Sequence, residues 1–204
     1  MKQIFKYLKN RFFTSSEKYW ENRYKSGEDS GAGSYNEFAE YKASFINEII
    51  SKYKIQTVCE LGCGDGNNLK YYKGFNKYYG FDVSNIIIEK NNKEFDEKKY
   101  NFHLLNTIDI PHVDLVMSLD VIYHLVEDEV FKNHMSQLFN SKSKYVIVYS
   151  SDFDSKRKFH VRHRKWTNQI PKNFNLIKKT DIPVKGSSAN LYFYLNLNLW
   201  NILS

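Results

Sequence analysis

The chain has 204 residues, of which 42% are hydrophobic and 17% aromatic, so it is long and apolar enough for one folded domain rather than a disordered segment. Its formal net charge of +7 favours an anionic partner: nucleic acid, a membrane surface or a phosphate-bearing small molecule. No apolar run approaches the ~20 residues of a membrane-spanning helix, and Lys6 and Lys9 interrupt any signal-peptide core. The two cysteines, Cys59 and Cys63, have no further ligands at zinc spacing, so we expect no structural metal and a reducing, cytoplasmic location.

The N-terminal region combines basic, aromatic and small residues. Residues 1–13 alternate basic and bulky apolar side chains, which favours a short helix packed on the domain; an amphipathic contact with a membrane or a partner is the alternative. Y-W-E-N-R-Y at 19–24 and S-G-A-G-S-Y at 30–35 are typical of a loop that folds over a ligand, although a flexible connector has the same composition. We therefore predict a helical cover over residues 1–36 and one main domain over residues 37–204.

In the main domain, predicted strands alternate with predicted helices. Apolar spacing predicts a helix over residues 37–53, and short apolar runs predict strands over 57–61, 78–81, 102–105, 114–119 and 145–149. Helical spacing returns over 86–95 and 126–139, and two further strands are expected over 174–177 and 191–195. This alternation predicts an α/β fold with a parallel, doubly wound sheet. Ligands of such sheets bind at the carboxyl ends of the strands, where most of the residues discussed below lie.

A glycine-rich turn, E-L-G-C-G-D-G at residues 60–66, follows the first predicted strand and precedes an expected helix. Glycines permit a tight turn and a close approach of the backbone to a ligand. A dinucleotide enzyme also has such a turn, but with the spacing G-x-G-x-x-G, and Glu60 would repel a pyrophosphate while attracting an ammonium group. Carboxylates at strand ends, such as Glu60 and Asp82, also cap helices. Their position after two successive strands favours ligand binding.

The pattern E-L-G-C-G-x-G, with Asp82 ending the next strand, resembles the class I S-adenosylmethionine-dependent methyltransferases. The resemblance implies a Rossmann-like fold with a seven-stranded, mostly parallel sheet, helices on both faces, S-adenosylmethionine as cofactor and S-adenosylhomocysteine as product. It further implies that Gly62 and Gly64 pass close to the methionine part of the cofactor. Asp82 would accept hydrogen bonds from both ribose hydroxyls, and Val83 would pack on the adenine.

The adenine edge departs from the family pattern, because Asn106 stands where an aspartate often accepts a hydrogen bond from the adenine amino group. An amide oxygen can still accept that bond, and Thr107 would supply a neighbouring backbone N–H. The predicted cofactor-binding residues are Tyr19, Arg23, Ser34, Glu60, Gly62, Gly64, Asp82, Val83, Asn106, Thr107 and Leu119.

Two other segments resemble one particular group of these methyltransferases. Y-W-x-x-R-Y followed by S-G-A-G-S-Y, and H-x-R-H-R-x-W-T at residues 160–167, resemble methyltransferases encoded with bacterial surface-polysaccharide genes. In that group Tyr19, Arg23 and Ser34 would hold the cofactor carboxylate, with Arg23 making the charge-assisted contact. The segment at 160–167 would contact the methyl acceptor.

The segment after the fourth strand, at residues 120–124, lies where class I enzymes place residues around the transferred methyl group. His124 has the pKa range of a general base, Asp120 would orient it or bind the acceptor, and Tyr123 would line the pocket. The alternative for His124 is a residue at a helix start that packs beneath the site. No N/D-P-P-Y/F tetrapeptide occurs here, which argues against a nucleobase as acceptor. Asp120 has no evident second ligand, so no catalytic metal is expected.

The densest basic segment contains His160, Arg162, His163 and Arg164. On an extended chain His160, Arg162 and Arg164 point to one side, which suits a phosphate or diphosphate. A solvated run of charges is the alternative. Other lysines are mixed with acidic residues, so a nucleic-acid groove is not favoured.

The sequence thus predicts an O-methyltransferase for a small anionic acceptor. No oligomeric state is predicted. A nucleotide-linked sugar or a phosphoramidate precursor of a bacterial capsule or lipopolysaccharide is the acceptor that the resemblance implies. Two alternatives stay open: an RNA-modifying methyltransferase, which the net charge favours, and a non-catalytic protein that binds the cofactor, against which the intact run from Asp120 to His124 argues.

Overall fold

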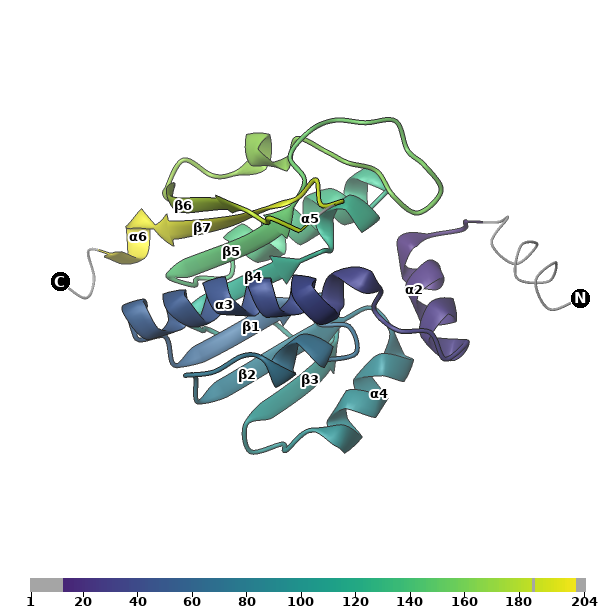
Figure 1. The fold of residues 1–204 in the computed structure, drawn as a ribbon, viewed down its shortest axis with the longest axis horizontal. Coiled ribbons are helices and arrows are strands. Elements are labelled where there is room, and N and C mark those ends of the chain that lie inside the picture. The colour runs from purple at the N-terminus through teal and green to yellow at the C-terminus, as the bar shows by residue number, and fades with distance from the viewer. Residues whose placement is uncertain (1–12, 185, 201–204) are drawn as a thin grey trace, which may run out of the picture.

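The fold is known from a computed structural model that describes residues 13–184 and 186–200. Its centre is a seven-stranded sheet of order β3-β2-β1-β4-β5-β7-β6 (Figure 1). β7 runs antiparallel to β5 and β6, and the other neighbouring strands pair in parallel. The predicted Rossmann-like fold with a mostly parallel sheet is therefore confirmed. The strands are β1 (Thr57–Leu61), β2 (Lys77–Asp82), β3 (Tyr100–Leu104), β4 (Leu115–Leu119), β5 (Tyr145–Ser150), β6 (Phe174–Asp181) and β7 (Asn190–Asn196).

Helices cover both faces of this sheet, as predicted. α3 and α4 contribute to one buried apolar cluster and α5 to the other, so the core has two layers separated by the strands. In α3, Ile46, Ile49 and Ile50 repeat at helical spacing and are all buried. The helices are α2 (Ser16–Lys25), α3 (Asn36–Tyr53), α4 (Asn85–Glu94), α5 (Asp128–Phe139) and α6 (Leu197–Trp200), with single turns η1 (Ala32–Ser34), η2 (Asn67–Lys70), η3 (Ile122–His124) and η4 (Trp166–Gln169).

The alternation of side chains along β1 decides which residues meet α3. Val58 packs into the cluster on the α3 side, whereas Cys59 and Leu61 pack into the cluster on the α5 side. By the same alternation Glu60 points toward the α3 side, where the buried Tyr78 of β2 donates a hydrogen bond to it. A carboxylate is thus buried between the sheet and α3.

The prediction of a helix directly after the glycine-rich turn is wrong. Only the single 3-10 turn η2 follows, because few residues remain between the end of the turn at Gly66 and the start of β2 at Lys77. Gly66 is left-handed at φ 70, and Gly74 is left-handed at φ 86 near the end of the connection. A short connection with a left-handed residue at each end leaves no room for a packed helix.

Sheet topology puts the carboxyl ends of β1 and β4 side by side, with β2 and β3 on one flank and β5 on the other. The chain leaves β1 and β4 toward opposite flanks, which creates the crevice where such sheets bind ligands. Figure 1 shows α2 just beyond these strand ends. The predictions for residues 1–12 lie outside the described residues. No helix in the described part of the chain is long and apolar enough to cross a membrane.

Candidate active site

A pocket lies at the carboxyl ends of β1, β2 and β4, below α2 and the loop that follows it. Its wall includes Trp20 and Tyr24 from α2, and Leu125 and Val130 from the opposite side. Nine of the residues predicted from the sequence line it: Ser34, Gly62, Gly64, Asp82, Val83, Asn106, Leu119, Asp120 and His124.

The glycine turn and Asp82 form one hydrogen-bonded unit. Gly62 and Gly64 have φ values of 86 and 55, in the region that favours glycine. The Gly64 N–H donates to Asp82 Oδ2 at 3.0 Å, and the Ser84 N–H donates to Asp82 Oδ1 at 3.0 Å. Burial raises the pKa of Asp82 to about 6, although these backbone N–H groups oppose the shift. The carboxylate is therefore fixed in orientation and faces the pocket.

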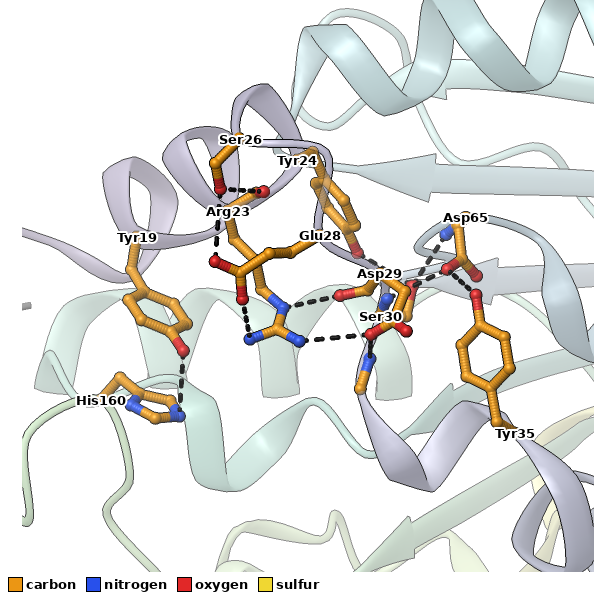
Figure 2. Close-up of polar contacts among 11 residues, drawn as sticks. Tyr19, Arg23, Tyr24, Ser26, Glu28, Asp29, Ser30, Tyr35, Asp65 and His160 are labelled. Atoms are coloured by element: carbon orange, nitrogen blue, oxygen red, sulfur yellow. Dashed lines mark hydrogen bonds and ion pairs between the residues drawn. The ribbon is translucent and has the colours of Figure 1, made fainter. Parts of the chain in front are cut away.

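The loop after α2 is tied to the same turn through Asp65. The Asp65 N–H donates to Ser30 Oγ at 2.9 Å, and Asp65 Oδ2 accepts from the Ser30 N–H at 3.0 Å and from the Tyr35 hydroxyl at 2.7 Å (Figure 2). A Cβ on Gly64 would lie 2.3 Å from Ser30 Oγ. We call α2 and the loop that follows it the roof of the pocket. The absence of a side chain at Gly64 thus allows this roof to close on the turn.

Tyr19 and Arg23, predicted to hold the cofactor carboxylate, project from α2 but do not line the pocket. Arg23 Nε donates to the Asp29 carbonyl at 2.6 Å, and its other nitrogens pair with Glu28 and Asp29 (Figure 2). The Tyr19 ring stacks on His160 at a centroid distance of 4.2 Å. Both side chains brace the roof from outside, and their predicted contact with a cofactor stays a prediction.

The adenine end of the predicted site lies between β2 and β3. Val83 lines the pocket, and so does Asn106, whose amide oxygen accepts from Gln137 Nε2 at 2.8 Å. Asn106 is left-handed at φ 67, a conformation that asparagine tolerates well. Thr107 faces a separate surface groove, and its hydroxyl donates to the Leu104 carbonyl at 2.6 Å. The Thr107 N–H, which is predicted to contact the adenine, also donates to the Leu104 carbonyl, at 3.2 Å, so the expected contact stays a prediction.

Glu60 lies below the pocket rather than in its wall. It is 2% exposed, and its Oε2 accepts from the Tyr78 hydroxyl at 2.8 Å. Burial raises its pKa to about 7, against the opposing effects of the Tyr78 hydrogen bond and the Lys42 charge. Glu60 does not line the pocket, and its predicted contact with the cofactor stays a prediction.

Asp120, Tyr123 and His124 meet where β4 enters η3. The Tyr123 hydroxyl donates to Asp120 Oδ1 at 2.5 Å, and the ammonium group of Lys42 in α3 forms an ion pair with Asp120 Oδ2. Asp120 is left-handed at φ 62, which turns its carboxylate toward the pocket. Tyr123 supports this carboxylate from behind and does not itself line the pocket.

His124 is buried against aromatic rings. Its ring packs edge-on to Trp20 at 5.0 Å and stacks with His160 at 5.3 Å. Burial lowers its pKa to about 4, so the imidazole is neutral at pH 7. Nδ1 lies 3.2 Å from the His160 carbonyl, which can only accept, so the proton is assigned to Nδ1 and the lone pair to Nε2.

The basic segment after β5 is anchored to the start of α5, and none of its four predicted residues lines the pocket. Arg162 and Arg164 both donate to Asp128 Oδ1, at 3.0 and 2.7 Å. Arg164 is 8% exposed, donates to the Val126 carbonyl and lies over the Phe131 ring, so its contacts are internal. His163 hydrogen-bonds to Ser151 at 2.5 Å. The expected single face is therefore split: the two arginines meet Asp128, and His160 meets Tyr19.

Two parts of the site were not found in the sequence. The glycine motif contains Asp65 but assigns it no role, although its carboxylate ties the roof to the turn. Lys42 sits in the buried stripe of α3 with Ala39 and Ala43, and its side chain is 0% exposed. A lysine within an apolar helical stripe is a detectable signal, because a buried ammonium group needs a partner.

No metal centre is evident in the described ranges, 13–184 and 186–200, where no cluster of three or more His, Cys, Asp or Glu side chains is placed to hold an ion. The polar groups that line the pocket are carboxylates, amides, hydroxyl groups and the imidazoles of His124 and His134, whose pKa values burial lowers to about 4.

Comparisons with known proteins agree with this fold. A family model described as "Methyltransferase domain" matches residues 26–181. The chain is similar to the N-methyltransferase NodS from Bradyrhizobium japonicum WM9 in complex with S-adenosyl-L-homocysteine, with a TM-score of 0.72 and 14% identity, covering 90% of this chain and 99% of that chain. It is also similar to magnesium protoporphyrin IX methyltransferase from Synechocystis PCC 6803 with bound SAM, with a TM-score of 0.64 and 15% identity, covering 90% and 98%. At these identities the similarity establishes the fold. A comparison with curated protein sequences found no match.

Proposed function

The chain belongs to a family of methyltransferase domains and is an S-adenosylmethionine-dependent methyltransferase, and we propose that it methylates an oxygen atom of a small acceptor. The observation that carries the proposal is one pocket in which Gly62, Gly64 and Asp82 lie beside Asp120 and His124. The first three have the residue types and positions that the cofactor needs. The other two lie where an acceptor would meet the methyl group.

The pocket fits the cofactor on the evidence of its own geometry. Each carboxylate oxygen of Asp82 accepts one backbone N–H, which leaves acceptor capacity on both oxygens for two neighbouring ribose hydroxyls. Val83 and Leu105 add apolar surface where the adenine would lie. An acidic residue at this strand end also holds the ribose of a dinucleotide, so the glycine spacing G-x-G-x-G, rather than Asp82, favours S-adenosylmethionine over a dinucleotide.

The cofactor supplies an electrophilic methyl group when bound. The residues of this chain then have three tasks: to align the acceptor, to take up its proton if it is a hydroxyl, and to exclude water. His124 has its lone pair on Nε2 and is the group proposed to accept the proton, and burial, which lowers its pKa to about 4, makes it a weaker base than a free imidazole. Trp20 and Tyr24 close the pocket from α2. These groups support an oxygen acceptor.

For the acceptor we propose a small anionic molecule, such as a nucleotide-linked sugar or a phosphoramidate precursor of bacterial surface polysaccharide, methylated in the cytoplasm. Arg162 and Arg164 share the single carboxylate of Asp128, so this trio keeps a net positive charge. The Arg162 side chain is 34% exposed and can still turn to a phosphate. The resemblance of residues 160–167 to the polysaccharide-linked group supports the same class.

The test is to incubate the protein with methyl-labelled S-adenosylmethionine and a panel of nucleotide-linked acceptors. We expect labelled product with a phosphate-bearing acceptor, and a KM for that acceptor raised about tenfold in Arg162→Ala but not in the exposed control Lys172→Ala. A large loss of kcat in His124→Ala that high pH rescues would point to a hydroxyl; a modest loss would point to an oxygen that is already ionised. Label on no small acceptor would contradict the proposal.

The second candidate is an RNA-modifying methyltransferase, favoured by the net charge of +7. It requires RNA binding that weakens steeply as salt is raised. Methylation of RNA fragments in place of the small acceptors would replace the first proposal. A protein that binds the cofactor without turning it over is the third, and formation of S-adenosylhomocysteine with any acceptor would eliminate it.

A further inference from the structure

The floor of the pocket contains an ion pair that no predicted role accounts for. Lys42 reaches from the middle of α3 to Asp120 Oδ2, and its side chain is 0% exposed. Its ammonium group also lies 5.1 Å from the centre of the Tyr149 ring. Burying an ammonium group costs free energy unless the group is paired. The role of Lys42 is therefore its ion pair with Asp120 rather than packing.

Asp120 is held at two points. Lys42 binds one carboxylate oxygen and the Tyr123 hydroxyl donates to the other at 2.5 Å, while Gly33 of the roof leaves room for the carboxylate because it has no side chain. A Cβ on Gly33 would come within 2.8 Å of Asp120 Oδ2. Two hydrogen bonds use about half of the acceptor positions of a carboxylate. The Asp120 side chain is 16% exposed and lines the pocket, so its remaining acceptor positions are available to a ligand there.

The side chain of Val121, the residue that follows Asp120, lies directly against the glycine turn. A Cβ on Gly62 would lie 2.3 Å from Val121 Cγ2. Asp120 therefore sits between the turn that would carry the methionine part of the cofactor and the roof at Gly33. Of the groups in this part of the pocket floor, Glu60 is the other buried carboxylate near Lys42.

We propose that Lys42 is a positioning residue of the transfer site, which holds the Asp120 carboxylate toward the cationic sulfonium end of the cofactor. This inference rests on the proposed use of S-adenosylmethionine. Asp120 attracts the positive sulfur, and Lys42 both fixes Asp120 and offsets its charge. When the methyl group leaves, the sulfur becomes neutral, so the Asp120 charge favours the cofactor over the product and the Lys42 charge limits that preference.

The test measures, by calorimetry, how strongly each variant prefers S-adenosylmethionine over S-adenosylhomocysteine. Asp120→Asn leaves Lys42 without its counter-ion and should lower the preference about three- to tenfold. Lys42→Met leaves a lone carboxylate and should raise it by a similar factor. The double variant has neither charge and should return to within about twofold of the wild type. Lys52→Met, an exposed lysine of the same helix, is the matched control and should leave the preference unchanged.

Opposite shifts in the two single variants cannot arise from structural damage, which weakens both ligands together. Equal weakening in Lys42→Met and Asp120→Asn would overturn the proposal and leave Lys42 a purely structural residue. If Lys42→Met does not fold, the comparison of Asp120→Asn with the double variant still isolates the Lys42 charge. A wild-type protein that binds neither ligand would instead contradict the proposed function, and that outcome is seen before any variant is compared.

Discussion

Asp82 should make the affinity of the pocket for S-adenosylmethionine depend on pH. Its pKa is raised to about 6 by burial, and only its ionised form offers acceptors on both oxygens. As pH falls from about 7.5 to about 5, Asp82 takes up a proton, so we predict that affinity for S-adenosylmethionine falls over this window. In Asp82→Asn the affinity should be about tenfold lower or more and should no longer fall near pH 6.

Calorimetry over the pH range checks this prediction, with Glu60→Gln as the control. The pKa of Glu60 is raised to about 7, so removing its titration should leave the fall near pH 6 in place. An affinity that is flat with pH in the wild type would show that Asp82 does not hold the ribose.

Gly33 tests whether the position of Asp120 matters, because its backbone conformation is open to alanine and only the contact with Asp120 opposes a side chain there. Gly33→Ala should displace the carboxylate and lower kcat about tenfold, while affinity for S-adenosylhomocysteine changes less than about threefold. Gly27→Ala is the control, since Gly27 is left-handed at φ 76 but has open space around it. It should reduce the melting temperature and leave kcat unchanged; equal kcat values in the two variants would argue against a precise position for Asp120.

At the scale of elements, α2 covers the pocket and is bonded to the start of α5, so we expect it to act as a lid. The Ser16 hydroxyl donates to Glu127 Oε2 at 2.5 Å, and the Ser16 N–H donates to Glu127 Oε1 at 2.8 Å. Ser16→Ala removes the hydroxyl that contacts Glu127, the His124 carbonyl and the Val126 N–H. Loss of one such bond is worth about 1–2 kcal/mol, so S-adenosylhomocysteine should dissociate about five- to thirtyfold faster.

Stopped-flow fluorescence of Trp20, which lines the pocket, can follow this release. Ser26→Ala lies at the other end of α2, where the hydroxyl bonds to Arg23 and Glu28 at the surface, and it should leave the rate unchanged. The same release rate in both variants would mean that α2 does not gate the pocket.

The basic segment after β5 combines an internal and an external arginine. Arg164 is buried and bonds to Asp128 and two backbone carbonyls of the connection before α5. Arg164→Ala should therefore lower the melting temperature by several degrees, whereas Arg162→Ala should change it little. Thermal unfolding of the two variants checks this contrast. Equal melting temperatures would show that Arg164 does not anchor the segment.

Across the whole molecule, the sequence predicted the sheet well because buried strands such as β5 carry unbroken apolar runs. The sequence wrongly predicted a helix after the glycine turn, because the connection from that turn to β2 is short. Asp82 and His124 were identified because their place in the chain, at a strand end, already fixes their place in the pocket. The burial of Lys42 is detectable in the helical pattern, but its partner Asp120 and the bracing role of Arg164 depend on which elements pack together, and a linear pattern does not carry that information.

The central claim is that the crevice between β1 and β4 binds S-adenosylmethionine. Titration calorimetry of the wild-type protein with S-adenosylmethionine and, separately, with NAD tests it most directly, because a glycine turn after β1 serves either ligand. The account predicts saturable one-to-one binding of S-adenosylmethionine, strongly weakened in Asp82→Ala, and no binding of NAD. Saturable binding of NAD, or S-adenosylmethionine binding that Asp82→Ala leaves intact, would contradict it.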